Sequence, residues 1–285
     1  MRLLTFYLSI TLSVFLLSSC GTETTSENED ESTPESIVYL GNNGITIVCK
    51  DAKVGDLGVV NGVEYEVVDK DLLLQRRDEE KDLSKVCVSL VTDMFGIFES
   101  FDLNQSIGNW DVSNVTNMGY MFYQSGFNQP IANWDVSSVT YMGYMFFEST
   151  FNQPIGDWDV SNVTDMVFMF YESVFDQPIG DWNLKNVTVS NGMFSGSIFN
   201  QSIGNWDVSS VTNMRDMFSS SQFNQPIGDW DVSNVTNMRQ MFEDSQFNQN
   251  ISNWCVSKIE KYPTNFSYRS PLLRENHPVW GTCPD

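Results

Sequence analysis

The chain has 285 residues, of which 37 are acidic and 15 are Lys or Arg, so its formal net charge is −22. Nucleic acid and anionic lipid surfaces are excluded as electrostatic partners, because both require clustered Lys and Arg. A charge of this sign suits a protein that stays dispersed outside the cell through self-repulsion.

A short apolar segment begins the chain. Residues 3–17 follow Arg2 and are apolar apart from small polar side chains. Ser18-Ser19-Cys20 comes directly after them. Such a segment is too short for a membrane span and is typical of a signal peptide. It resembles the bacterial lipoprotein signal, which implies cleavage after residue 19, acylation of Cys20, and a lipid-anchored protein of the bacterial cell envelope, exposed on the outer membrane. The alternative is an ordinary secretory signal with a chance cysteine.

Two segments precede the repeats. Residues 20–36 are predicted to be a disordered acidic tether, because Ser, Thr and Glu dominate and no aromatic side chain could form a core. Residues 37–82 are predicted to be a mainly β N-terminal cap. Strands are expected over residues 45–48 and 58–60, Asn61-Gly62 predicts a hairpin turn into residues 63–68, and residues 71–81 predict a short charged helix.

The central part of the chain repeats with a fixed period. Tryptophan recurs every 24 residues, at positions 110, 134, 158, 182, 206, 230 and 254. Worn copies flank these, the first with Val86 in place of tryptophan, the last with Tyr262 and Asn265 where methionines are expected. Such a period is typical of a solenoid, in which each unit buries its apolar face on its neighbours. We therefore predict a repeat solenoid over residues 83–254 and a C-terminal cap over residues 255–285.

Each repeat is predicted to hold a strand and then a helix. Apolar residues alternate around the tryptophan, and then follow at spacings of three and four; one repeat shows this as Ile227, Trp230, Val232, Val235, Met238, Met241 and Phe242. Asn recurs in the connecting turn at 104, 128, 152, 200, 224 and 248, with Asp176 as the exception. We expect these side chains to bond the backbone of the next turn as an asparagine ladder.

The full repeat motif is Phe-Asn-Gln-x-Ile-x-x-Trp-Asp-Val-Ser-x-Val-Thr-x-Met-x-x-Met-Phe. It resembles the leucine-rich-repeat scheme and, over residues 79–266, the BspA-like surface-protein repeats of bacterial lipoproteins. The resemblance implies an α/β, leucine-rich-repeat-like right-handed solenoid, surface display, and an adhesive or ligand-binding role without one defined ligand.

Four cysteines remain besides Cys20, an even number that suggests two disulfides in an exported chain. Three pairings are possible. Two cysteines lie before the repeats and two at their end, which favours Cys49–Cys87 and Cys255–Cys283 as staples of the two ends.

No motif for catalysis, a cofactor or a metal stands out. The one histidine, His277, is expected on the surface, and no nucleophile or phosphate-loop motif is present. We therefore predict a protein that is not an enzyme and that has neither cofactor nor metal site. Recurring aspartates at 111, 135, 159, 207 and 231 leave two alternatives: stacked columns that attract a cation or a basic partner, or local bonds to backbone amides.

Function is expected where the repeats differ from one another. Two positions beside the core residues are aromatic in three successive repeats and small or polar in the next two. The six candidate ligand-binding residues are Tyr120, Tyr123, Tyr144, Phe147, Phe168 and Tyr171. A stripe of aromatic side chains is typical of a contact surface for an extracellular protein or glycan. The alternatives are an aromatic ladder that only packs, and a structural spacer of the cell envelope without a ligand.

Overall fold

The computed structural model describes residues 37–102 and 104–284. These residues form one compact unit. The predicted signal peptide, Cys20 and the acidic tether at residues 20–36 lie outside the described residues. Within the described part of the chain, no helix is long and apolar enough to cross a membrane.

The N-terminal cap contains two small sheets and one helix. Strand β1 (Tyr39–Leu40) pairs antiparallel with β2 (Ile47–Val48), and β3 (Leu57–Val60) pairs antiparallel with β4 (Val63–Val67). Strand β5 (Val86–Cys87) then pairs parallel with β4, after α1 (Lys70–Asp78) and the 3-10 helix η1 (Leu83–Lys85).

The sequence predictions for this cap are confirmed in their main features. Asn61 and Gly62 form the β3–β4 turn with φ angles of 52° and 81°, a conformation that these two residue types tolerate best. Helix α1 begins after Asp69, whose carboxylate accepts the N–H of Leu72 at 2.9 Å and so satisfies one free donor of the first turn.

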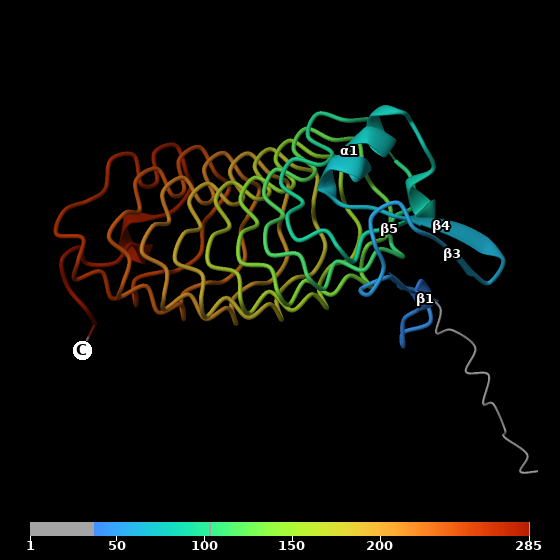
Figure 1. Cartoon of the computed structure of the whole chain (residues 1–285). Helices are drawn as coiled ribbons and strands as arrows, with labels where there is room; N and C mark the ends of the chain where they lie inside the picture. Colours follow the sequence, from blue (N-terminus) through green and yellow to red (C-terminus); the bar gives the residue numbers. More distant parts are fainter. Residues whose placement is uncertain (1–36, 103, 285) are drawn as a thin grey trace, which may run out of the picture. The chain divides into compact units, whose positions relative to one another are not determined.

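The repeats stack side by side, each making one turn of the chain (Figure 1). Isolated parallel bridges link each repeat to the next, from Asp93 with Asn117 through to Asn213 with Asn237. Every second N–H of the bridging segment donates to the neighbouring repeat. In one repeat, Tyr120 donates to Gly143 at 3.1 Å and Phe122 to Met145 at 2.9 Å. These bonds satisfy backbone groups that a single repeat would leave unpaired.

The predicted helix of each repeat is wrong, and so is the predicted strand around the tryptophan. The supposed helical segment is a series of tight turns, and it is this segment that carries the parallel bridges. Tyr120 and Gln124 have φ angles of 57° and 50°, and the corresponding residues of most other repeats are also left-handed. A left-handed residue interrupts an α-helix. Turns with an i to i+3 bond, such as Met121 N–H to Met118 O at 3.3 Å, reproduce the three-residue apolar spacing that suggested a helix.

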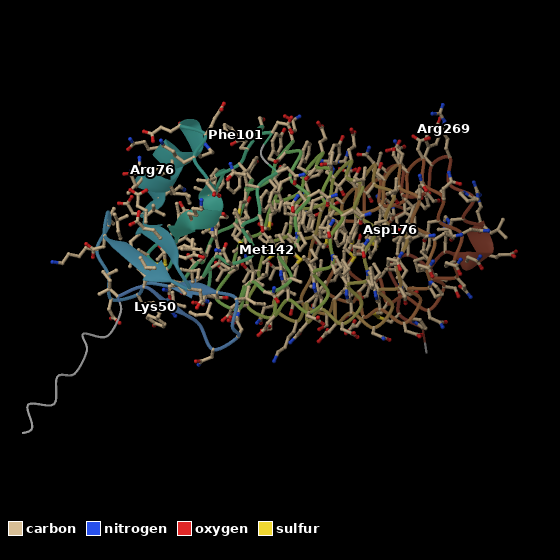
Figure 2. All side chains as sticks on the ribbon, turned by 90° about the vertical axis from the view of Figure 1, so that its right-hand side faces the viewer. Lys50, Arg76, Phe101, Met142, Asp176 and Arg269 are labelled. Carbon is tan, nitrogen blue, oxygen red and sulfur yellow. A yellow bond between two sulfur atoms is a disulfide. The ribbon has the colours of Figure 1, made fainter. Side chains whose placement is uncertain are left out.

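Columns of identical apolar side chains fill the interior of the stack. Trp110 and Trp134 stack at 6.2 Å between ring centroids, and Phe122 and Phe146 at 5.5 Å. Each indole N–H also donates to a carbonyl of the preceding repeat, as from Trp158 to Ile131 at 3.2 Å. These side chains are buried, and Met142 lies among them inside the stack (Figure 2). One repeat alone would leave both faces of every column in water, so the core exists only through stacking.

The predicted asparagine ladder is confirmed. The side-chain oxygen of Asn128 accepts the N–H of Asn152 at 2.9 Å, and Asn152 accepts the N–H of Asp176 at 3.0 Å. Asp176, the one exception in the sequence, accepts from Asn200 at 2.9 Å in the same way. A carboxylate oxygen replaces an amide oxygen here without loss of the bond, because only an acceptor is needed.

Both predicted disulfides are present. Cys49–Cys87 ties the loop after β2 to β5, and Cys255–Cys283 ties the last tryptophan-containing repeat to the chain end. The register expected for the last worn repeat is wrong by one residue. Phe242 N–H donates to Phe266 O at 2.8 Å where Phe218 donates to Met241, so Phe266, and not Asn265, takes the methionine position.

Candidate binding surface

The six aromatic residues singled out in the sequence lie together on the surface of neighbouring repeats. They lie in or directly after the bridging segment of their repeat and are half-buried. We call this set, with the residues added below, the aromatic stripe. It contains Tyr120, Tyr123, Tyr144, Phe147, Phe168 and Tyr171.

The rings form two parallel columns. In the first column, Tyr120 stacks on Tyr144 at 4.5 Å, and Tyr144 contacts Phe168 at 5.4 Å. The first column contacts the second within each repeat, as between Tyr120 and Tyr123 at 5.4 Å.

In the second column, Phe147 stacks between Tyr123 at 4.7 Å and Tyr171 at 4.4 Å. All these distances lie in the range of direct aromatic packing. The six rings therefore make one continuous surface and are not scattered exposed residues.

Two further aromatic residues belong to the stripe and were missed in the sequence. Phe95 extends the first column, 5.0 Å from Tyr120, and is 41% exposed. The ring of Tyr141 lies over Gly119 and Gly143, where any side chain on either glycine would collide with it. Both aromatic residues stand at repeat positions that are mostly polar or small in the other repeats. That difference between repeats could have identified them in the sequence.

Glycines end the stripe on the side of the later repeats. Gly192 stands at the position of Phe168 one repeat on, and the Phe168 ring lies over it. Gly196 stands likewise at the position of Glu172, whose side chain covers it. The surface is therefore confined to a few repeats, although the core columns continue through the whole stack.

Carboxylate and amide groups border the second column. Gln124 donates to Glu148 at 2.7 Å, and these residues occupy successive repeats beside Tyr123 and Phe147. A hydrogen bond to Glu172 raises the pKa of Tyr171 above its usual range, with burial adding to the effect. The stripe thus combines flat apolar rings with a row of hydrogen-bond acceptors and carries no cation among the residues named here.

Burial also affects the pKa of groups in the stripe and near it. It raises the pKa of Tyr120 to about 12, with neighbouring tyrosines contributing. Burial likewise raises the pKa of Asp165, whose carboxylate accepts the Val167 N–H at 2.9 Å. Both phenol and carboxyl are therefore partly withdrawn from water although they lie near the surface.

The recurring aspartates make local bonds. Asp135 accepts both the N–H and the hydroxyl of Ser137, at 3.1 Å and 2.6 Å, and Asp207 bonds Ser209 in the same way. The Ser209 hydroxyl bond is the main cause that lowers the pKa of Asp207. Of the two alternatives for the recurring aspartates, this geometry matches local hydrogen bonds within one turn and not columns that attract a cation. Among residues 37–102 and 104–284, no group of three or more His, Cys, Asp or Glu residues is placed to hold a metal ion.

Comparison with known proteins gives a family and no closer relative. The family described as "Mycoplasma protein of unknown function, DUF285" matches residues 71–175 and again residues 172–277. No curated protein and no solved structure matches significantly. The two matches together extend over most of the chain, so the protein belongs to the DUF285 family and carries two tandem copies of its pattern.

Proposed function

We propose that the protein is a lipid-anchored, BspA-like surface protein that recognises an extracellular glycan or protein through the aromatic stripe. The stacked repeats would form a leucine-rich-repeat-like right-handed solenoid that holds this surface rigid. The role is binding without catalysis. Cys20 would carry the lipid and residues 20–36 would hold the repeats away from the outer membrane.

The stripe is the single observation that carries this proposal. Repeat positions that serve only packing are identical from turn to turn, such as the tryptophan column. The stripe is instead aromatic in some repeats and is replaced by Gly192 and Ser195 in the next. Partly exposed, contiguous aromatic rings are costly to leave in water, and such patches mark contact sites.

The border of the stripe favours a glycan over a protein as ligand. A sugar ring offers an apolar C–H face that stacks on an aromatic ring, and hydroxyl groups that donate to neighbouring acceptors. Gln124, Glu148 and Glu172 supply such acceptors beside the rings. The carboxylates of Glu148 and Glu172 would repel an anionic ligand, so a neutral glycan fits best.

An array of extracellular proteins and glycans tests the proposal. The stripe variant combines Tyr120→Gln, Tyr144→Gln and Phe168→Gln, because Gln240 occupies the same repeat position with a φ of 58°. The matched control removes exposed apolar groups outside the stripe, as Val174→Ser with Ile198→Ser. We expect a neutral glycan to bind the native protein and the control and to be lost from the stripe variant. If the stripe variant binds the same ligand as the native protein, or if nothing binds, the alternative of a structural spacer without a ligand is favoured.

The anchor is tested separately. Cys20→Ala should abolish incorporation of a labelled fatty acid and release the protein from the membrane fraction of the cells that produce it. Unchanged lipid labelling of this variant would refute the lipoprotein assignment. The proposal for the aromatic stripe would be unaffected.

A further inference from the structure

A cavity of about 690 Å³ lies in the C-terminal cap, away from the aromatic stripe. Its lining includes Tyr262, Tyr268, Arg269, Arg274, His277 and Trp280. This volume is within the range of small-molecule sites in proteins. The cap lies at the end of the stack opposite to α1, and Arg269 marks it in Figure 2.

The cavity arises from one change in the repeat. The hydrogen bonds between the last two repeats are shifted by one residue relative to the earlier ones. Phe266 therefore takes the repeat position of Met241, and Ser267 takes that of Phe242. The phenylalanine column therefore ends at Phe242. Phe266 meets that last ring edge-on, at 86°, whereas Phe218 and Phe242 are nearly parallel at 3°. A small side chain where a phenylalanine stands in the preceding repeats leaves the space unfilled.

Polar groups line the opening that Ser267 creates. The Ser267 hydroxyl lies 3.0 Å from the Tyr262 hydroxyl and 3.2 Å from His277 Nε2. Burial lowers the pKa of His277, which favours the neutral ring, and a hydrogen bond to the Leu272 backbone occupies the ring besides the contact with Ser267. The histidine expected on the surface is in fact partly buried and stacks at 5.9 Å on the Tyr262 ring.

Aromatic rings form the apolar wall. Tyr262 and Tyr268 are 49% and 50% exposed. Trp280 packs edge-on against Tyr262 at 5.8 Å and Phe266 at 4.9 Å, which fixes its orientation. Such a wall accepts the C–H face of a sugar ring.

The charge of the cavity is opposite to that of the chain. No Asp or Glu is among its described lining residues, although acidic residues outnumber basic ones 37 to 15. Arg269 lies over the Tyr268 ring at 5.1 Å and reaches Asp244 at 3.5 Å. Within residues 37–102 and 104–284, no carboxylate forms an ion pair with Arg274.

We propose that this cavity is a second binding site, specific for a sugar that carries a carboxylate. Arg274 binds the carboxylate, since a guanidinium pairs with a carboxylate through two parallel hydrogen bonds, and Arg269 also lines the cavity. Tyr262 and Trp280 receive the ring face, and the Ser267 hydroxyl, held by His277, accepts a hydrogen bond from one of the sugar hydroxyls. The site is independent of the stripe, whose acidic border selects against such a ligand.

A matched pair of sugars tests the site on the purified protein. The methyl glycosides of glucuronic acid and of glucose differ only at C6, which is a carboxylate in the first and a hydroxymethyl group in the second, and their dissociation constants can be measured by NMR titration. We expect the glucuronide to bind at least about tenfold more tightly, as one charge-assisted contact implies. Equal affinities, or no binding of the glucuronide, would overturn the proposal.

Variants separate the cavity from other sources of binding. Arg274→Gln should weaken glucuronide binding by about 10- to 100-fold, whereas Arg239→Gln, an exposed arginine outside the cavity, should leave it unchanged. Ser267→Phe restores the side chain of the preceding repeats and should abolish binding by filling the space. Glucuronide affinity that survives Arg274→Gln or Ser267→Phe would refute the site. The stripe variant keeps this affinity, so failure of the stripe proposal and failure of this one are distinguishable.

Discussion

Truncation of one interior tryptophan tests how the repeats are held together. Trp158 is 3% exposed, stacks on Trp134 at 6.4 Å and donates its indole N–H to Ile131 O at 3.2 Å. Replacement of a buried tryptophan by alanine costs about 3–5 kcal/mol through lost burial and the remaining cavity. The unpaired Ile131 carbonyl adds about 1–3 kcal/mol. The combined loss of roughly 4–8 kcal/mol is a large part of the stability of a typical domain.

The loss should be felt locally first. Each repeat contacts only its neighbours, so Trp158→Ala should open the repeats on either side of residue 158 before the caps. Hydrogen exchange followed by mass spectrometry should show faster exchange there, together with a lower melting temperature. Val174→Ala, an exposed position in a neighbouring part of the stack, is the control and should change stability by less than about 0.5 kcal/mol. If Trp158→Ala melts and exchanges like the native protein, the stacking described here is wrong.

Three further predictions concern the ladder, a buried carboxyl and the disulfides. Asn152→Ala removes the acceptor of two bonds from the next repeat and should cost about 1–3 kcal/mol in urea unfolding; an unchanged midpoint would contradict the ladder. Burial raises the pKa of Asp165, so its ionised form destabilises the folded state and this penalty fades as the pH falls through the folded-state value. Asp165→Asn should therefore raise the melting temperature at pH 7, with a gain that shrinks on acidification; a gain independent of pH would refute this cause. Mild reductant should open Cys255–Cys283 before the buried Cys49–Cys87, as alkylation and peptide mapping can show; the reverse order would contradict the exposure of the two bridges.

Local signals in the sequence were sufficient for several parts of the fold. The Asn61-Gly62 turn and the asparagine ladder each depend on a residue type whose geometry is specific, and the disulfide pairing followed from the positions of the cysteines before the repeats and at their end. The conformation predicted inside a repeat, a strand followed by a helix, is wrong. An apolar spacing of three and four residues fits a helix and also fits successive turns, and only the left-handed residues such as Tyr120 distinguish the two. Left-handed tyrosine is rare enough that sequence reasoning does not anticipate it.

The candidate sites show the same division. The stripe was predicted because its two main positions vary together between repeats, whereas Phe95 and Tyr141 vary alone and were missed. The C-terminal cavity could not be predicted, because the one-residue shift that places Ser267 in the phenylalanine column is visible only in the backbone hydrogen bonds.

Stability and binding measured on one variant test the central claim most directly. The claim is that the aromatic stripe is a recognition surface and not only packing. The triple variant Tyr120→Gln, Tyr144→Gln and Phe168→Gln should keep a melting temperature close to that of the native protein, because Gln240 fits the same position, and should lose the array ligand. A variant that melts far lower, or one that still binds the ligand as the native protein does, would contradict the claim.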